Sequence, residues 1–270
     1  MTDFHPPTIE ALRRLIATLR GENGCPWDQK QTPDTLSVYV IEEIYELVEA
    51  IAADDTDAIL EELGDALFQL LFVAHLYEQA GRFSLDQVLE RIITKMIRRH
   101  PHVFGEDKVE SAGEVKQRWR KIKQQEKGVR DSLLDSIPSG MPALMRAYRI
   151  SERAAATGFD WDDLAGVMAQ AELEWDEFKA EVGHEKPSGA ERSKAAMEFG
   201  DVLFTLVNVA RLAGIHPETS LSQSSQKFIR RFKYMEEHAG RRSGSLESLS
   251  RDEMEKLWQA AKKADPLSDG

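Results

Sequence analysis

The chain has 270 residues, of which 41% are apolar and 30% charged, and its formal net charge at pH 7 is −12. This composition is typical of a globular, soluble protein with one large or two small domains. The negative charge argues against nucleic acid as a partner, because cationic side chains that neutralise phosphates dominate such binding. A small anion that arrives with its own metal ion is compatible with it.

The sequence also predicts a cytoplasmic protein with no membrane partner. Cys25 is the only cysteine, so no internal disulfide can form, as is usual in the reducing cytosol. No apolar run approaches the roughly 18 residues that a membrane-spanning helix needs. The first residues, "MTDFHPPTIEALRRL", lack the basic segment followed by an apolar stretch that marks a signal peptide.

Apolar residues recur at helical spacing through nearly the whole chain. Amphipathic stretches cover residues 12–19, 36–51 and 60–71, and later helices are expected to begin near Leu85, Ala112, Pro142, Asp163, Ser188, Leu221 and Arg251. Ser250 and Glu253 match the capping box that starts a helix. No alternating run of β-branched residues is long enough to predict a sheet. We therefore predict an all-α fold.

Helix-breaking residues gather near the middle of the chain, in residues 127–144. They predict a first domain in residues 1–127, a linker in 128–141 and a second domain in 142–270. Four blocks recur in the same order in the two halves, which indicates two copies of one domain. The blocks are Glu43 and Glu46 with Glu174 and Glu177, Glu62 and Asp65 with Glu198 and Asp201, "KMIRRH" from Lys95 with "KFIRRF" from Lys227, and Trp119 with Trp258.

The repeated acids are expected to meet on a helical hairpin. Residues three apart lie on one face of a helix, so Glu43 and Glu46 point together, and so do Glu62 and Asp65. The polar break "DDTD" between the pairs allows the two helices to fold back antiparallel. The four carboxylates then face each other across the hairpin. The same holds for Glu174, Glu177, Glu198 and Asp201 in the second copy.

Such a cluster favours a bound cation. Two carboxylates 4 Å apart repel by about 4 kcal/mol at an effective dielectric of 20, which exceeds any gain from helix propensity. Oxygen ligands favour a hard cation, Mg²⁺ with Mn²⁺ as a substitute. Solvated helix faces are the alternative, but these acids interrupt an apolar stripe and occur in both copies. Gly64 and Gly200, between each Glu and Asp, weaken the helix and suggest close approach of a backbone or ligand.

Basic and aromatic residues in the second copy could bind a nucleotide. Lys227, Arg230 and Arg231 form one basic helix edge, and arginine matches phosphate oxygens with paired donors. Trp258 could stack on a base. An ordinary amphipathic surface and a core tryptophan are the alternatives.

These residues together resemble the MazG nucleoside triphosphate pyrophosphohydrolases, an all-α family. Its pattern is Glu-Glu-x-x-Glu, a spacer, then Glu-x-x-Asp. The first copy has Glu42, Glu43 and Glu46 before Glu62 and Asp65, whereas the second copy has Leu173 at the leading position. "ENGCPWD" and "RRHPHVF" are also similar to blocks of the tandem two-domain members.

The resemblance implies Mg²⁺-dependent hydrolysis of (d)NTPs to nucleoside monophosphate and pyrophosphate, in control of nucleotide pools or in a stress response. It also implies homodimers whose helices pair into four-helix cores. The second copy would hold Mg²⁺ through Glu174, Glu177, Glu198 and Asp201, with Glu174 or Glu177 as the base that accepts the proton of water. The first copy would use Glu43, Glu46, Glu62 and Asp65. The substrate ligands would be Lys194, Lys227, Arg230, Arg231 and Trp258.

Two alternatives have other functions. The protein could be a non-catalytic nucleotide- or metal-binding oligomerisation module, an interpretation that suits the first copy best. The position that matches Lys194 in that copy is Ala58. We therefore expect the second copy to be the better catalyst. A di-iron carboxylate bundle needs two Glu-x-x-His motifs, and the sequence has a single one, Glu181 to His184.

Overall fold

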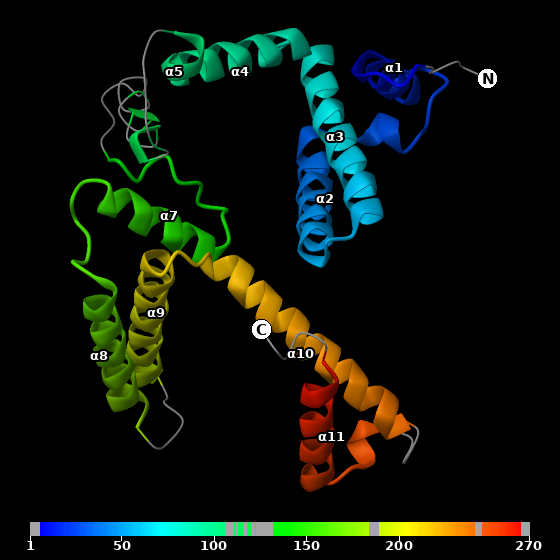
Figure 1. Ribbon diagram of the computed structural model, residues 1–270. Helices are drawn as coiled ribbons and strands as arrows, with labels where there is room; N and C mark the ends of the chain where they lie inside the picture. Colours follow the sequence, from blue (N-terminus) through cyan, green and yellow to red (C-terminus); the bar gives the residue numbers. More distant parts are fainter. Residues whose placement is uncertain are drawn as a thin grey trace. The chain divides into compact units, whose positions relative to one another are not determined.

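A computed structural model describes residues 6–105, 111, 113–115, 118–119, 122, 132–183, 189–240 and 245–265. Every regular element within these ranges is a helix (Figure 1), which confirms the all-α prediction. The contacts divide the chain into two units, residues 1–128 and 129–270. The predicted bounds at 127/128 and 141/142 stay predictions, and the first of them falls among residues 123–131, outside the described part of the chain.

The first unit is built around a helical hairpin. Helix α2 (Pro33–Ala53) packs along α3 (Thr56–Gln79), and α1 (Ile9–Arg20) packs on α3. Further along the chain are α4 (Leu85–Arg99) and the short α5 (Pro101–Phe104). The core takes four buried apolar side chains from α3 and one each from α1, α2 and α4, with Ile16, Leu36 and Phe72 the most deeply buried.

The turn between α2 and α3 follows from the "DDTD" sequence. Asp54 adopts a left-handed conformation (φ 54°), which aspartate tolerates better than most residues. The carboxylate of Asp55 then accepts hydrogen bonds from the backbone N–H groups of Asp57 and Ala58, which caps α3. The predicted antiparallel hairpin is thereby confirmed.

The second unit contains a corresponding hairpin, α8 (Leu164–Val182) with α9 (Gly189–Leu212). Helix α7 (Ala143–Ala155) packs on α9, and α10 (Pro217–Gly240) makes a second helical pair with α11 (Arg251–Ala264). Met235, Ala239, Leu257 and Ala261 form the core of that pair. In Figure 1, α11 lies away from the α8–α9 hairpin, beside the far part of α10.

Most predicted helix starts are close to the observed ones. Ser250 and Glu253 form the predicted capping box of α11. The start expected at Leu221 is wrong, because α10 begins at Pro217. Proline suits the first turn of a helix, and Glu218 accepts a hydrogen bond from the backbone N–H of Met145 there. The start expected at Ala112 falls outside the described ranges, and α9 is described from Gly189, next to the predicted Ser188.

Candidate active site

Three carboxylates meet on each hairpin. Glu43 of α2 lies with Glu62 and Asp65 of α3, and one carboxylate oxygen of each is within 4.8 Å of the others; we call this the first acid cluster. The second acid cluster consists of Glu174 of α8 with Glu198 and Asp201 of α9, and here too one carboxylate oxygen of each lies within 4.8 Å of the others. Six of the eight acids predicted to bind metal are therefore gathered as expected.

The remaining predicted acids, Glu46 and Glu177, lie outside these close sets but still act on them. Burial raises the pKa of Glu198, and the negative charge of Glu177 raises it further, ahead of Asp201 and Glu174. The pKa of Glu62 is raised by burial and then by the charge of Glu46. Both residues are thus close enough to influence a cation in their clusters, and both are exposed.

One further acid acts on the second acid cluster. The negative charge of Glu181 also contributes to the raised pKa of Glu198. Glu181 stands one helical turn after Glu177 on α8, so the spacing was visible in the sequence as a third acid on the same face. The first copy has Ala50 at this position. His184, the partner required by the di-iron alternative, lies outside the described residues.

The raised pKa values have one physical origin. Each carboxylate is partly withdrawn from water and surrounded by like charges, and both conditions favour the protonated form. Burial is the largest cause for Glu43, followed by the charges of Asp65 and Glu46. A divalent cation would reverse this balance because it favours the ionised form. The donors are all carboxylate oxygens, which suits a hard ion such as Mg²⁺ or Mn²⁺.

The two helix-interior glycines face open space in a single chain. A Cβ built on Gly64 or on Gly200 would meet no atom within 4 Å. No close backbone approach within the described part of the protomer therefore explains them. The sequence suggested that a backbone or a ligand approaches these glycines closely. A ligand or the backbone of a second protomer would meet that expectation.

The predicted basic edge lies on α10 and is partly occupied by an acid. Nε of Arg231 donates to Oδ2 of Asp265 at 2.9 Å, and Nη2 of Arg230 lies 3.5 Å from Oδ1. The Asp265 side chain is only 2% exposed, and that of Arg231 is 14% exposed. Lys227 and Lys194 are exposed, and Lys194 stands one turn before Glu198 on α9.

Trp258 is half-buried between the two helices of the α10–α11 pair. Its ring packs against Phe228, with centroids 5.3 Å apart, and Nζ of Lys262 lies 5.7 Å from its centroid. The tryptophan also packs on the core around Met235 and Leu257. It therefore has a structural role, and its role as a nucleotide ligand stays a prediction.

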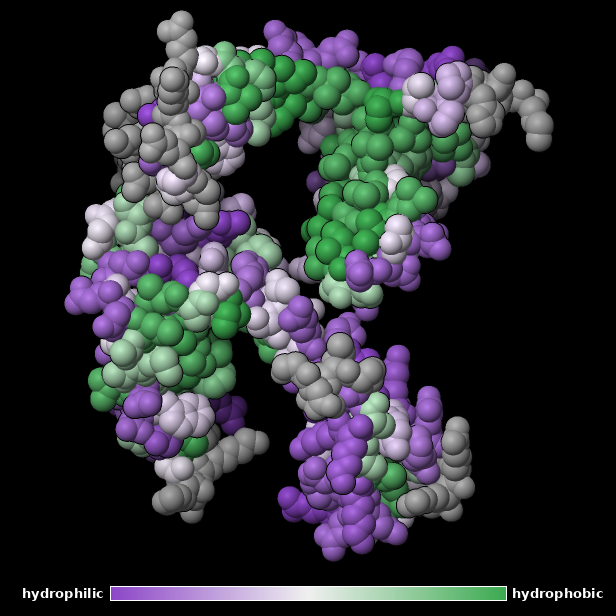
Figure 2. Space-filling view, viewed as in Figure 1, coloured by the Kyte–Doolittle hydropathy of each residue, from purple (hydrophilic) through white to green (hydrophobic). Residues whose placement is uncertain are grey.

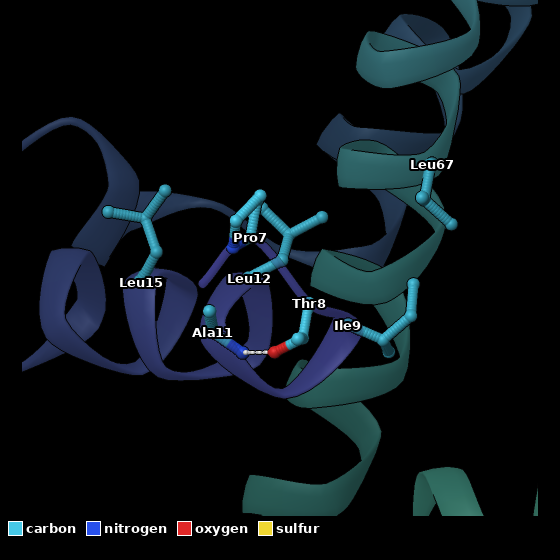
Figure 3. Close-up of a pocket in the computed structure, with 7 residues that line it drawn as sticks. All are labelled: Pro7, Thr8, Ile9, Ala11, Leu12, Leu15 and Leu67. Carbon is cyan, nitrogen blue, oxygen red and sulfur yellow. Dashed lines mark hydrogen bonds between the residues drawn. The ribbon is translucent and has the colours of Figure 1, made fainter. Parts of the chain in front are cut away.

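An apolar pocket of about 550 Å³ lies elsewhere, between α1 and α3. Figure 3 shows that Ile9 and Leu67 approach one another across its edge. Oγ1 of Thr8 accepts a hydrogen bond from the backbone N–H of Ala11 and so caps α1. None of its lining residues is charged: Pro7, Thr8, Ile9, Ala11, Leu12, Leu15 and Leu67. The acid clusters are thus separate from this pocket and belong to the open hairpin surfaces.

The fold and the carboxylate clusters define an all-α protein with two groups of acids that could hold a metal ion. Residues 31–104 match the MazG nucleotide pyrophosphohydrolase domain. The chain is 40% identical over 258 residues to a nucleoside triphosphate pyrophosphohydrolase of Escherichia coli (strain K12), a match that covers 94% of this chain and 97% of the relative. It is also 40% identical to the nucleoside triphosphate pyrophosphohydrolase/pyrophosphatase MazG of Thermotoga maritima, over 95% and 96% of the two chains.

The chain therefore belongs to the MazG family of nucleoside triphosphate pyrophosphohydrolases, and the prediction of an enzyme of this hydrolase class is confirmed. Among solved structures, a mazG-related protein from Thermotoga maritima is similar at 31% identity and a TM-score of 0.38. That match covers 43% of this chain and 99% of the other.

Proposed function

We propose that this chain hydrolyses nucleoside triphosphates to nucleoside monophosphate and pyrophosphate with Mg²⁺ at the second acid cluster. The observation that carries the proposal is the convergence of Glu174, Glu198 and Asp201 on one α8–α9 surface. Relatives of nearly equal length that carry the pyrophosphohydrolase name support the substrate class. We propose that in the cell this activity clears nucleotide pools or controls nucleotides during stress.

We assign separate catalytic roles to the residues of the second copy. Glu174, Glu198 and Asp201 would hold the ion, which neutralises phosphate charge and lowers the pKa of a bound water when present. Glu177 is outside the close set but acts on Glu198, so it is the better placed of the two predicted bases. It would take the proton of the water that attacks the α-phosphorus in line. Lys194, one turn from Glu198, would bind a phosphate oxygen.

The structure does not bring the basic residues of α10 to the second acid cluster, since the α10–α11 pair extends away from the α8–α9 hairpin. Once the two are brought together, these residues would bind the rest of the triphosphate. Arg230 keeps 42% of its side chain exposed, and Lys227 is exposed one turn before it. Asp265 fixes Arg231, so this arginine supplies a positioned charge rather than a mobile one. Trp258 beside Phe228 would offer an aromatic surface at the nucleoside end.

A non-catalytic role for the first copy rests on specific substitutions. Ala58 replaces Lys194, and Ala50 replaces Glu181, so the first copy lacks one phosphate-binding cation and one acid. Helix α4 ends at Arg99 before Pro101, whereas the matching α10 continues to Gly240. We propose that the first acid cluster binds metal and supports assembly, while the second performs most turnover.

A homodimer is the assembly that we propose. Leu60 on α3 is 74% exposed and Met197 on α9 is 71% exposed, and neighbouring apolar residues extend both faces. Figure 2 shows continuous hydrophobic surface over α2 and α3 and over much of α8 and α9. Apolar areas of this kind are covered by a partner in stable proteins. Pairing of hairpins from two protomers into four-helix cores would cover them and bring a second backbone towards Gly64 and Gly200.

Product analysis over a panel of canonical and modified (d)NTPs with Mg²⁺ tests the proposed function. Anion-exchange chromatography should resolve nucleoside monophosphate and pyrophosphate in equal amounts, with little turnover in EDTA. Nucleoside diphosphate with orthophosphate as the main products would contradict cleavage between the α- and β-phosphates. Sedimentation of the purified chain tests the dimer in the same preparation.

A further inference from the structure

Each acid cluster has one glutamate that a glutamine side chain holds. In the second unit, Nε2 of Gln170 donates to Oε1 of Glu174 at 2.8 Å, and both residues are on α8. In the first unit, Gln69 on α3 lies close enough to Glu43 on α2 to act as a donor that lowers the pKa of the Glu43 carboxyl. Glu43 and Glu174 are corresponding positions of the two copies, and each is the member that its cluster takes from the first helix of the hairpin.

The two glutamines do not correspond to one another. The offset that relates Glu43 to Glu174 pairs Gln170 with Tyr39, and the offset that relates Glu62 to Glu198 pairs Gln69 with Thr205. The corresponding carboxylates of the two copies therefore have amide donors from different positions. Gln170 lies on the same helix as Glu174, whereas Gln69 lies across the hairpin from Glu43. Chance retention of one ancestral contact does not account for that arrangement, whereas a shared requirement of the carboxylate does.

Stability alone is a poor explanation for these contacts. Oε1 of Gln69 is buried and has no hydrogen-bond partner among the described residues. A buried acceptor without a partner destabilises a fold, so an apolar side chain of similar size would serve packing better. Gln170 forms an along-helix pair, and such pairs add little to helix stability. The exposed pair Gln259 and Glu255 on α11, with Nε2 and Oε1 2.7 Å apart, is of that ordinary kind.

We propose that Gln170 and Gln69 are positioning residues that orient Glu174 and Glu43 for a divalent cation. The inference rests on the proposed metal role of the acid clusters. A metal-binding carboxylate works best when one oxygen is fixed by a donor and the other is left for the ion. An amide supplies that donor without adding charge, and it remains a donor throughout the working pH range.

The first test measures Mn²⁺ binding by electron paramagnetic resonance, with Mn²⁺ as the probe. The parent carries Glu62→Gln, which disables the first acid cluster and leaves the second as the site observed. Gln170→Met in this parent should weaken Mn²⁺ binding about 10- to 100-fold, as loss of an outer partner of a metal ligand usually does. Gln259→Met, the matched control, should leave binding unchanged.

The reciprocal test uses a Glu198→Gln parent, in which Gln69→Met should weaken binding at the first acid cluster. Thermal melts in EDTA accompany both tests. Gln69→Met should melt at or above its parent, because it removes a buried unpartnered oxygen. Steady-state kinetics of Gln170→Met in the otherwise wild-type chain should show a raised Mg²⁺ requirement, with a smaller loss of kcat at saturating Mg²⁺.

Unchanged Mn²⁺ affinity in folded Gln170→Met would overturn the positioning role while leaving the proposed function intact. Weakening by Gln259→Met to the same extent would overturn it as well, since a general loss of helix pairs would then explain the result. If neither parent binds Mn²⁺, the metal site and the proposed function fail together.

Discussion

A carboxylate oxygen of Glu174 on α8 lies within 4.8 Å of one on Glu198 of α9, although the residues are far apart in the sequence. Two like charges at this separation repel across the hairpin unless a proton or a cation lies with them. The raised pKa of Glu198 reflects the same repulsion together with burial. The acid clusters should therefore make the fold sensitive to metal.

Asp201→Asn should separate repulsion from ligation. In EDTA the variant should melt higher than wild type, because one charge of the second acid cluster has been removed. Added Mg²⁺ binds the folded protein and should stabilise wild type by about 2.7 kcal/mol at a hundredfold excess over Kd. The variant has lost a ligand, so its gain should be smaller. Paired thermal melts with and without Mg²⁺ measure both effects.

Asp176→Asn on α8 is a suitable control, since Asp176 is exposed and paired with Lys179 rather than with the cluster. A lower melting temperature for Asp201→Asn in EDTA, with an undiminished response to Mg²⁺, would mean that these acids share no cation.

The metal-free protein should lose stability from the clusters as pH rises above about 4.5, the ordinary pKa of glutamate. Glu198 has a pKa above that value in the fold, so the folded state binds more protons than the unfolded chain in this window. By linkage, its contribution to the free energy of unfolding is greatest at low pH and falls as pH rises through the raised pKa. Melting temperatures of wild type and Glu198→Gln in EDTA between pH 4 and 8 check this. The melting temperature of the variant should rise relative to that of wild type as pH increases. A difference in melting temperature that does not change with pH would exclude the raised pKa.

Gly200→Ala should stabilise the chain but reduce its activity. Alanine favours a helix interior over glycine by about 1 kcal/mol, and a Cβ at this position meets nothing within 4 Å in one protomer. The added methyl group would instead obstruct the ligand or the second protomer that we propose to approach there. Chemical denaturation and turnover of the same preparation measure the two effects. Full activity in a more stable Gly200→Ala protein would show that nothing approaches this glycine.

Asp265→Asn should weaken both the α10–α11 pair and substrate binding. The change leaves Arg231 without its buried anion and should lower the free energy of unfolding by about 2 kcal/mol. A less firmly held Arg231 should also raise KM for the nucleotide more than it lowers kcat. Urea denaturation and steady-state kinetics test this, with the exposed Glu236→Gln on α10 as control. A KM equal to that of wild type would remove Arg231 from the substrate site.

The sequence predicted the all-α fold and both carboxylate clusters because their signals are local. Helical spacing places Glu62 and Asp65 on one face, and the "DDTD" turn returns that face to Glu43. Most helix starts also depend on nearby residues, such as Ser250 with Glu253. The early start of α10 was missed because the bond between Glu218 and Met145 joins segments far apart in the chain.

The contacts that surround the site could not be read from the same patterns. Gln69 reaches Glu43 across a helix interface, and nothing in its own neighbourhood marks it. Asp265 meets Arg231 only because α11 folds back on α10. Glu181 is different, since its spacing from Glu177 was visible and its influence on Glu198 could have been predicted.

The most direct test of the account compares Glu198→Gln with Glu62→Gln, the same change at corresponding positions of the two acid clusters. Pyrophosphate release from (d)NTPs is measured with saturating Mg²⁺, on proteins whose folding is verified by thermal melts. We predict that Glu198→Gln loses at least about 100-fold in kcat, as removal of a group that stabilises transition-state charge does, while Glu62→Gln keeps most of its activity. Wild-type turnover by folded Glu198→Gln would contradict the assignment of catalysis to the second acid cluster.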